Sequence, residues 1–100
     1  MKNFRAFNLA VSFYKQTQCQ KLPGGLKSQL DRAASSIALN LCEARGRQSL
    51  KDQIRFFHIA MGSLRECEGI LTLADLTNTP IWLTLDCLGA HLYKLIKNAK

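Results

Sequence analysis

The sequence has few prolines, no long apolar run and few acidic side chains, and each shortage narrows the possible structures. Only two prolines occur among 100 residues, so most of the chain can form helices without interruption. No apolar run approaches the roughly 20 residues that a membrane-spanning helix needs. The first residues also lack the continuous apolar segment of a secretory signal. We therefore expect a cytoplasmic protein that does not enter a membrane.

None of the four cysteines belongs to a Cys-x-x-Cys pair, and each falls within a helical pattern. This spacing argues against a disulfide framework. We interpret Cys42, Cys67 and Cys87 as small apolar residues that fill gaps in a reducing compartment. His58 and His91 have no cysteine at ligand spacing, so we expect no bound metal. Without a phosphate-binding loop or a nucleophile–base arrangement, we also predict no catalytic residues, no cofactor and no enzyme activity.

Basic side chains outnumber acidic ones by two to one. The chain has 14 Lys and Arg against 7 Asp and Glu, which gives a formal net charge of +7. Such an excess on a small domain attracts polyanions through counterion release, although it gives no sequence specificity. Composition therefore favours RNA or DNA as a ligand.

Four amphipathic segments separated by short breaks predict a single domain over residues 1–100. They cover residues 5–19, 26–44 and 50–76, and the chain from residue 80 onward. No segment shows the alternation and hairpin turns that are typical of strands. Short connections make consecutive helices antiparallel neighbours. We therefore predict an all-α protein, an antiparallel up-down-up-down four-helix bundle.

The residues at the breaks indicate how the helices start and stop. Proline and paired glycines at positions 23–25 favour a turn. Gly46 suits the left-handed position that often follows a helix. Ser49 is placed to cap the third helix, while Thr79 and Pro80 are placed to start the fourth.

Apolar spacing predicts the buried face of each helix, and on two helices it predicts more apolar surface than one core requires. The main expected stripes are Phe4, Phe7, Val11 and Tyr14; Leu26, Leu30, Ala33, Ala34, Ile37 and Leu41; Phe56, Phe57, Ala60, Leu64 and Leu71; and Ile81, Leu85, Leu88, Leu92 and Leu95. The first helix has a second apolar stripe, formed by Ala6, Leu9 and Phe13. The third helix is apolar over most of its circumference, since four more apolar residues lie outside its main stripe: Ile54, Ile59, Met61 and Leu73. Either these residues fit an intramolecular core or a second subunit covers them. We favour a homo-oligomer, in which Gly62 and Gly69 would let a neighbouring helix approach closely.

A polar ridge runs along the second helix within an arc of about 80°. It consists of Arg32, Ser36, Asn40, Glu43 and Arg47. Arg55 and Glu66 lie on one side of the third helix, where opposite charges on the two helices can pair. Three interpretations stay open: a solvated helix face, a structural network that links helices or subunits, or direct contact with a ligand.

A basic turn precedes and opens the third helix. Arg45, Arg47, Lys51 and Arg55 fall within eleven residues, next to the backbone N–H groups and the positive dipole end of that helix. We predict these four side chains as the nucleic-acid-binding site, with a purely solubilising role as the alternative. Because Phe56 is assigned to the core together with its neighbour Phe57, we expect contacts to the nucleic-acid backbone or shape rather than base stacking.

Several fragments together resemble a known family. They are the run Arg-Ala-Ala-Ser-Ser-Ile at 32–37, the run Gly-Arg-Gln-Ser at 46–49, Arg-Phe at 55–56 and the run at 59–66. The combination resembles the bacterial four-helix-bundle family of 23S rRNA intervening-sequence proteins. This resemblance implies a bundle that commonly assembles as a ring-shaped homopentamer and is not an enzyme. The chain is also similar to accessory proteins of diversity-generating retroelements, which bind nucleic acid beside a reverse transcriptase.

Carried over by position, the recurrent polar residues of the family match Arg32, Ser36, Asn40, Glu43, Arg55, Ser63 and Glu66. The resemblance thus adds Ser63 to the candidate structural polar network. The family often has proline near the position of Ala38 and glycine at that of Ala44, so we expect a straighter end to the second helix here. The chain is short after Thr79, and a shorter fourth helix would weaken a subunit contact.

The sequence thus predicts a non-enzymatic homo-oligomer, with a pentamer favoured, that binds structured RNA or DNA through its basic surface. The alternative is a protein-interaction scaffold, such as an accessory subunit of the reverse transcriptase of a diversity-generating retroelement.

Overall fold

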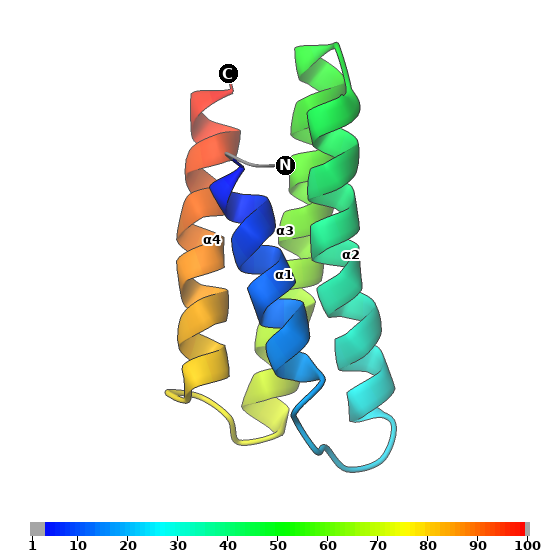
Figure 1. Ribbon diagram of the computed structural model, residues 1–100, viewed down its shortest axis with the longest axis vertical. Helices are drawn as coiled ribbons and strands as arrows, with labels where there is room; N and C mark the ends of the chain where they lie inside the picture. Colours follow the sequence, from blue (N-terminus) through cyan, green and yellow to red (C-terminus); the bar gives the residue numbers. More distant parts are fainter. Residues whose placement is uncertain (1–3, 100) are drawn as a thin grey trace.

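The computed structural model describes residues 4–99 and contains four α-helices, with no strand in that range. Their bounds are α1 Arg5–Thr17, α2 Leu26–Gly46, α3 Leu50–Leu73 and α4 Pro80–Asn98. Each helix packs against two others, because α1 and α3 both contact α2 and α4. The α1–α2 and α3–α4 connections lie at one end of the molecule and the α2–α3 turn at the other (Figure 1). The prediction of an all-α protein with four helices is confirmed.

One continuous core runs between the helices. It is built from a single apolar stripe on each of α2, α3 and α4, and these stripes match the expected ones closely. Their most deeply buried large side chains are Leu30, Ile37, Leu41, Leu64, Leu71, Leu85, Leu88 and Leu92.

On α1 the expected stripe is wrong apart from Phe4, which is buried. Ala10 and Phe13 are fully buried, whereas Phe7 and Val11 are half-buried and Tyr14 is 36% exposed. The larger side chains therefore lie to one side of the buried face, and the stripe that faces the core consists of two alanines, Phe13 and Thr17. Small residues let α1 lie close to its neighbours, a preference that side-chain size alone does not reveal.

The ends of α3 follow from local hydrogen bonding. The Ser49 hydroxyl accepts a hydrogen bond from the backbone N–H of Asp52 at 3.0 Å, which confirms the expected cap. At the other end the helix stops at Leu73, three residues before the expected end. Asp75 adopts a left-handed conformation with φ of 63°, and the N–H of Leu76 bonds back to the carbonyl of Leu71 at 2.9 Å. This is a Schellman ending that uses aspartate in place of the usual glycine.

The expected left-handed conformation of Gly46 is wrong. The α2 helix continues through Gly46, and Arg47 leaves it in an extended conformation with ψ of 140°. Among the glycines of residues 4–99, only Gly24 has positive φ, in the α1–α2 turn. Thr79 does occupy the position before α4 and Pro80 is its first residue, but the Thr79 hydroxyl donates to the carbonyl of Leu76 instead of capping the helix.

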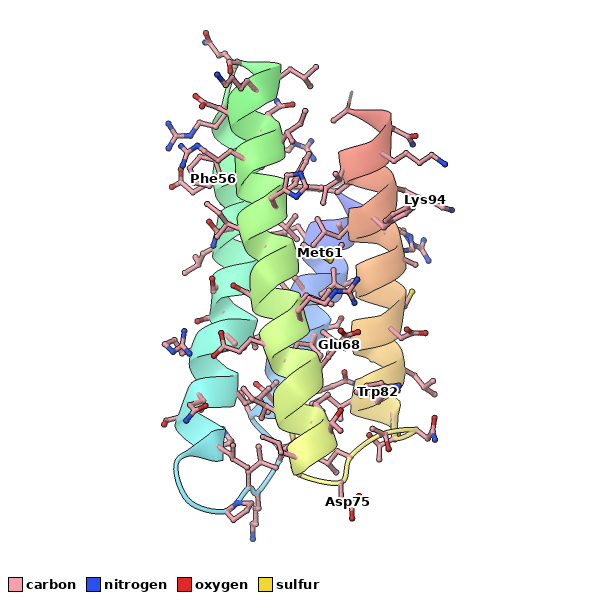
Figure 2. All side chains as sticks on the ribbon, turned by 180° about the vertical axis from the view of Figure 1, so that it is seen from behind. Phe56, Met61, Glu68, Asp75, Trp82 and Lys94 are labelled. Carbon is pink, nitrogen blue, oxygen red and sulfur yellow. The ribbon has the colours of Figure 1, made fainter. Side chains whose placement is uncertain are left out.

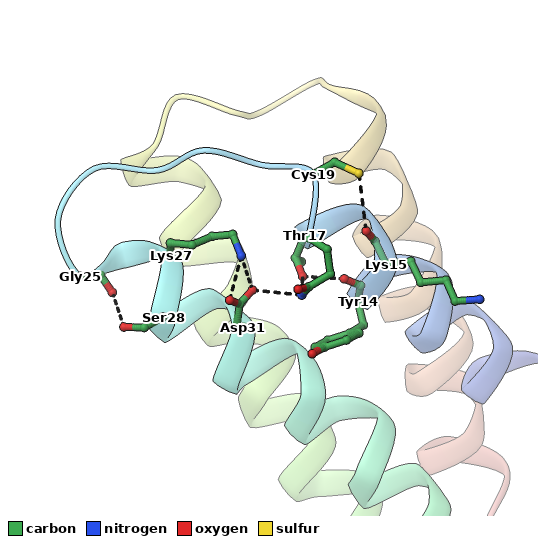
Figure 3. A network of polar contacts seen from close by, with 9 residues as sticks. Tyr14, Lys15, Thr17, Cys19, Gly25, Lys27, Ser28 and Asp31 are labelled. Carbon is green, nitrogen blue, oxygen red and sulfur yellow. Dashed lines mark hydrogen bonds and ion pairs between the residues drawn. The ribbon is translucent and has the colours of Figure 1, made fainter.

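A polar cluster ties the end of α1 to the start of α2 (Figure 3). Lys27 pairs with Asp31 at 2.8 Å within α2. Gln18 donates to the same carboxylate at 3.3 Å and to the Thr17 hydroxyl at 3.1 Å. The buried Thr17 hydroxyl in turn donates to the carbonyl of Tyr14 at 2.6 Å, so this buried polar group is satisfied.

The outer face of α3 is open. A side chain added at Gly62 or Gly69 would meet no atom within 4 Å, so within the described chain no helix approaches these glycines. Ile59 and Leu73, from the same helix, are 41% and 75% exposed. Within residues 4–99, no helix combines the length and the apolar character needed to cross a membrane.

The cysteines divide differently from the expectation. Cys67 is buried as expected, but Cys42 and Cys87 are exposed, as is Cys19. The expectation was wrong for Cys42 and Cys87, because both lie on the outward faces of their helices. Helical spacing alone did not show which face these two residues occupy. Burial raises the pKa of the Cys67 thiol to about 12, with a further contribution from the nearby Glu66 carboxylate.

Thiol labelling checks this division. At pH 8 a thiol-reactive reagent should modify Cys19, Cys42 and Cys87 in the folded protein, and Cys67 only after denaturation. Reaction of all four thiols at similar rates without denaturant would contradict the structure.

The raised pKa of Cys67 also predicts how stability depends on pH. Because the pKa of this thiol in the folded protein lies above its ordinary value of 9.0, the free energy of unfolding should fall as the pH rises from 9 toward 12. A Cys67→Ala variant should show a smaller fall over the same range.

Candidate functional site

A polar seam joins α2 to α3 along one side of the molecule. Arg32 of α2 pairs with Glu66 of α3, and the hydroxyls of Ser36 and Ser63 share a hydrogen bond of 2.8 Å across the two helices. Asn40 donates to the backbone carbonyl of Ser36 at 2.8 Å and to its hydroxyl at 3.1 Å. Five of the six residues expected in a structural polar network are thus brought together.

This seam lies at the surface. The side chains of Arg32 and Glu66 are 65% and 39% exposed, so water screens their attraction and the pair is worth at most about 1 kcal/mol. Ser36, Ser63 and Asn40 are half-buried. The Ser36–Ser63 hydrogen bond therefore fixes the register of α2 against α3 more firmly than the ion pair does, and Asn40 supports it by holding the Ser36 hydroxyl.

The remaining expected members stand apart from the seam. Glu43 pairs with Arg47, the first residue after α2, at 2.9 Å. Arg55 was expected on the same side of α3 as Glu66, where it could pair with a charge on α2, but its Nε lies 3.9 Å from the Asp52 carboxylate in its own helix. Both pairs lie at the basic turn. The polar ridge predicted on the second helix therefore has two parts, one that contacts α3 in the seam and one that belongs to the basic turn.

At the α2–α3 turn, three arginines lie over phenylalanine rings. The guanidinium carbons of Arg47 and Arg55 are 4.8 Å and 4.4 Å from the centre of the Phe56 ring. That of Arg45 is 5.1 Å from the centre of the Phe4 ring. Such stacking orients the guanidinium groups and leaves their N–H edges available to an anion. Figure 2 shows Phe56 toward the end of the molecule that carries the turn.

Phe56 was expected to belong to the core, and this expectation is only half right. Its ring is half-buried and packs against the core, but it also carries two guanidinium groups. Phe57, by contrast, is buried. The sequence offered one signal for this role, because Arg55 directly precedes Phe56 and Arg47 lies just across the turn.

Two carboxylates moderate the charge of the turn. Glu43 and Asp52 contact Arg47 and Arg55, which leaves two of the four positive charges balanced within the protein. Arg45 and Lys51 are exposed and form no ion pair within residues 4–99. Lys51 lies in the first turn of α3, where the helix dipole adds to its field.

Two hollows interrupt the surface. The larger, of about 500 Å³, lies where α1 begins, α3 begins and α4 ends, with Phe4, Phe57 and Lys94 among its lining residues. The smaller, of about 210 Å³, is an apolar groove between α1 and α2, in which Tyr14 and Leu39 take part. Sequence reasoning identified neither hollow, because each is formed by residues from different helices.

No group of three His, Cys, Asp or Glu side chains within residues 4–99 is arranged to hold a metal ion. His58 is exposed. His91 donates from Nδ1 to the carbonyl of Cys87 at 3.0 Å, so its other ring nitrogen is an acceptor when the ring is neutral.

Comparison with known families decides the affiliation of the chain. The family model described as 23S rRNA-intervening sequence protein matches residues 4–80. The chain belongs to this family. The matched range includes the polar seam and the basic turn and ends at the first residue of α4. Neither the curated proteins nor the solved structures gave a match, and the relationship to retroelement accessory proteins is not among these findings.

A single substitution and a double-mutant cycle test the two parts of the seam. Removing the Ser36 hydroxyl with Ser36→Ala should lower the free energy of unfolding by about 1 kcal/mol, because the Ser63 hydroxyl then loses its interhelical partner. In a cycle of Arg32→Ala and Glu66→Ala, the coupling energy should be only about 0.5 kcal/mol, since both side chains are screened by water. Urea unfolding measures both, and a coupling above about 2 kcal/mol for the ion pair would show that it is shielded from solvent.

Proposed function

We propose that this protein is a non-enzymatic homo-oligomer, with a pentamer favoured, that binds structured RNA or DNA through the α2–α3 turn. Each subunit would be an up-down-up-down bundle, an order supported by loops at alternating ends of the molecule (Figure 1). The name of the family refers to an intervening sequence of 23S rRNA, which supports a role connected with nucleic acid.

The observation that carries the proposal is the arrangement of arginines over phenylalanine rings at the turn. Free arginine side chains lose conformational entropy when they bind, but Arg45, Arg47 and Arg55 are already positioned by the rings beneath them. Prepositioned guanidinium forks suit the oxygen atoms of phosphates. Lys51 adds a charge at the same end. Contacts of this kind favour the nucleic-acid backbone and give little base specificity.

The oligomer is supported by apolar surface that the single chain leaves exposed. Leu39 is 64% exposed and lies beside the groove between α1 and α2, which has no polar lining atoms exposed to solvent. The edge of this groove includes the half-buried Val11 and Ala38 and the ring of Tyr14. A second copy of the chain would remove this surface from water.

The same groove favours a second candidate function, a protein-interaction scaffold such as an accessory subunit of a reverse transcriptase. In that case a different protein would cover Leu39, and the nucleic-acid contacts of the turn would be secondary or absent. The two functions separate experimentally, because one predicts self-association and salt-dependent RNA binding and the other predicts neither.

Charge substitutions test the binding surface. Lys51→Gln should weaken binding of a short RNA duplex roughly fivefold at about 0.15 M salt, and should reduce the slope of log affinity against log salt by about 0.9, as expected for one lost phosphate contact. Lys21→Gln is the matched control, since it removes the same charge at the opposite end of the molecule. Fluorescence anisotropy across a salt series gives both quantities, and equal effects of the two substitutions would place the binding surface elsewhere.

Removing the carboxylates of the turn should have the opposite effect. Glu43→Gln and Asp52→Asn each release an arginine from its partner, so each should strengthen duplex binding by roughly two- to fivefold. Glu68→Gln is the control, because Glu68 pairs with Arg65 at 2.8 Å along α3 and away from the turn. Weaker binding after either substitution at the turn would show that the carboxylates position the arginines for the ligand.

A pair of exposed leucines tests the oligomer. Leu39 and Leu83 are 64% and 60% exposed, but only Leu39 lines the α1–α2 groove. Leu39→Glu should shift the mass measured by light scattering toward the monomer, whereas Leu83→Glu should leave it unchanged. A wild-type protein that is monomeric at micromolar concentration would end the oligomer proposal.

A further inference from the structure

The 500 Å³ cavity at the end of the molecule combines an apolar wall with a basic rim. The wall includes the rings of Phe4 and Phe57, together with Leu50 and Leu95. Both rings are more than nine-tenths buried, so only part of each is presented to the cavity. A hollow of this size and composition is in the range of small-molecule sites in proteins.

Within residues 4–99, the charged side chains that line the cavity have one sign. Arg5 and Lys94 are exposed at its edge, and the described part of the lining includes no aspartate or glutamate. Figure 2 shows Lys94 on α4, toward the end of the molecule opposite Asp75 and Trp82. The rim therefore complements an anionic group, while the wall complements a flat apolar one.

Two amide side chains and His91 also line the cavity. Gln53 and Asn98 both border the cavity, and Gln53 donates from Nε2 to the carbonyl of Arg47 at 2.9 Å. This hydrogen bond leaves the Gln53 carbonyl oxygen and one N–H available. An aliphatic anion in the cavity would displace the water molecules bound to these amide groups and would not replace the hydrogen bonds of that water. The edge of a nucleobase offers both donors and acceptors, so it could replace them.

We propose that this cavity binds one unpaired nucleotide of a single-stranded RNA or DNA segment. The base lies against the phenylalanine wall within reach of the amides, and its phosphate lies at Arg5 and Lys94. The inference rests on the proposed nucleic-acid function, and it assigns a second site that adjoins the α2–α3 turn, since Arg45 lies over the Phe4 ring of the cavity wall. Apolar contact with the exposed parts of the two rings does not depend on which base is bound, so the site selects unpaired over paired nucleotides and not one sequence.

Binding of a single-stranded tetra-adenylate RNA by the full chain tests the proposal. Lys94→Gln should weaken this binding roughly fourfold at about 0.15 M salt, the effect of one lost phosphate contact on a single strand. Lys97→Gln is the matched control, because Lys97 is also exposed on α4 but does not line the cavity. Equal effects of the two substitutions would overturn the assignment.

A second variant fills the cavity without removing charge. Leu50 is 51% exposed and borders the hollow, so Leu50→Trp should leave the melting temperature nearly unchanged while it abolishes tetra-adenylate binding. The methyl NMR signals of Ala6 and Leu95 should shift with tetra-adenylate in the wild type and not in the variant. Undiminished binding by a folded Leu50→Trp protein would overturn the proposal.

Two further ligands separate the possible failures. If sodium octanoate shifts these methyl signals and tetra-adenylate does not, the cavity is a site for apolar anions and the inference is wrong. If a blunt RNA duplex binds in a Lys51-dependent manner but tetra-adenylate leaves the cavity signals unchanged, the inference fails and the proposed function stands. If neither RNA binds, both fail.

Discussion

The close packing of α2 against α3 is the constraint on which the rest of the structure depends. These two helices form the most extensive contact in the molecule, and small buried residues such as Ala33, Ala34 and Ala60 contribute to their buried faces. Small side chains let helix axes approach closely, which in turn brings the hydroxyls of Ser36 and Ser63 within hydrogen-bonding distance. The same packing fixes how the chain reverses after Gly46, and so it determines where the basic side chains of the turn are held.

Hydrophobic spacing was enough to predict the number of helices and most of the core. The stripes of α2, α3 and α4 repeat at helical spacing and contain large residues such as Ile37, Leu64 and Leu88, so the main buried face of each could be predicted, even on α3 with its additional apolar residues. On α1 two stripes competed, and the one with larger side chains was chosen wrongly. The buried stripe is rich in small residues, so tertiary packing, which helical spacing does not show, decides which of the two stripes faces the core. The end of α3 was predicted three residues too late. Asp75 adopts the left-handed conformation that glycine usually adopts at a helix end, so the sequence carried no glycine signal there.

The candidate site was predictable as a set of residues but not as an arrangement. Spacing along α2 placed Arg32 and Ser36 on one ridge, and the family resemblance indicated Ser63 on α3. Spacing could not show that Arg47, just after α2, pairs back with Glu43, whereas Arg32 pairs with Glu66 of α3. It also assigned Phe56 wholly to the core, because periodicity reports which face a residue occupies and not how far its ring extends to the surface. The two hollows are created by several helices together and leave no pattern in any one segment.

The exposed thiols have a practical consequence for any measurement of assembly. Cys19, Cys42 and Cys87 all lie at the surface, and Cys42 is on α2, three residues from the exposed Leu39 beside the apolar groove. Subunits that meet through this face would bring thiols of separate chains close to one another. Air oxidation would then join them covalently, and a reversible assembly would be recorded as a permanent one. Sizing in the presence of a reductant is therefore part of determining the oligomeric state, and cross-linking through Cys42 would in turn map which faces meet.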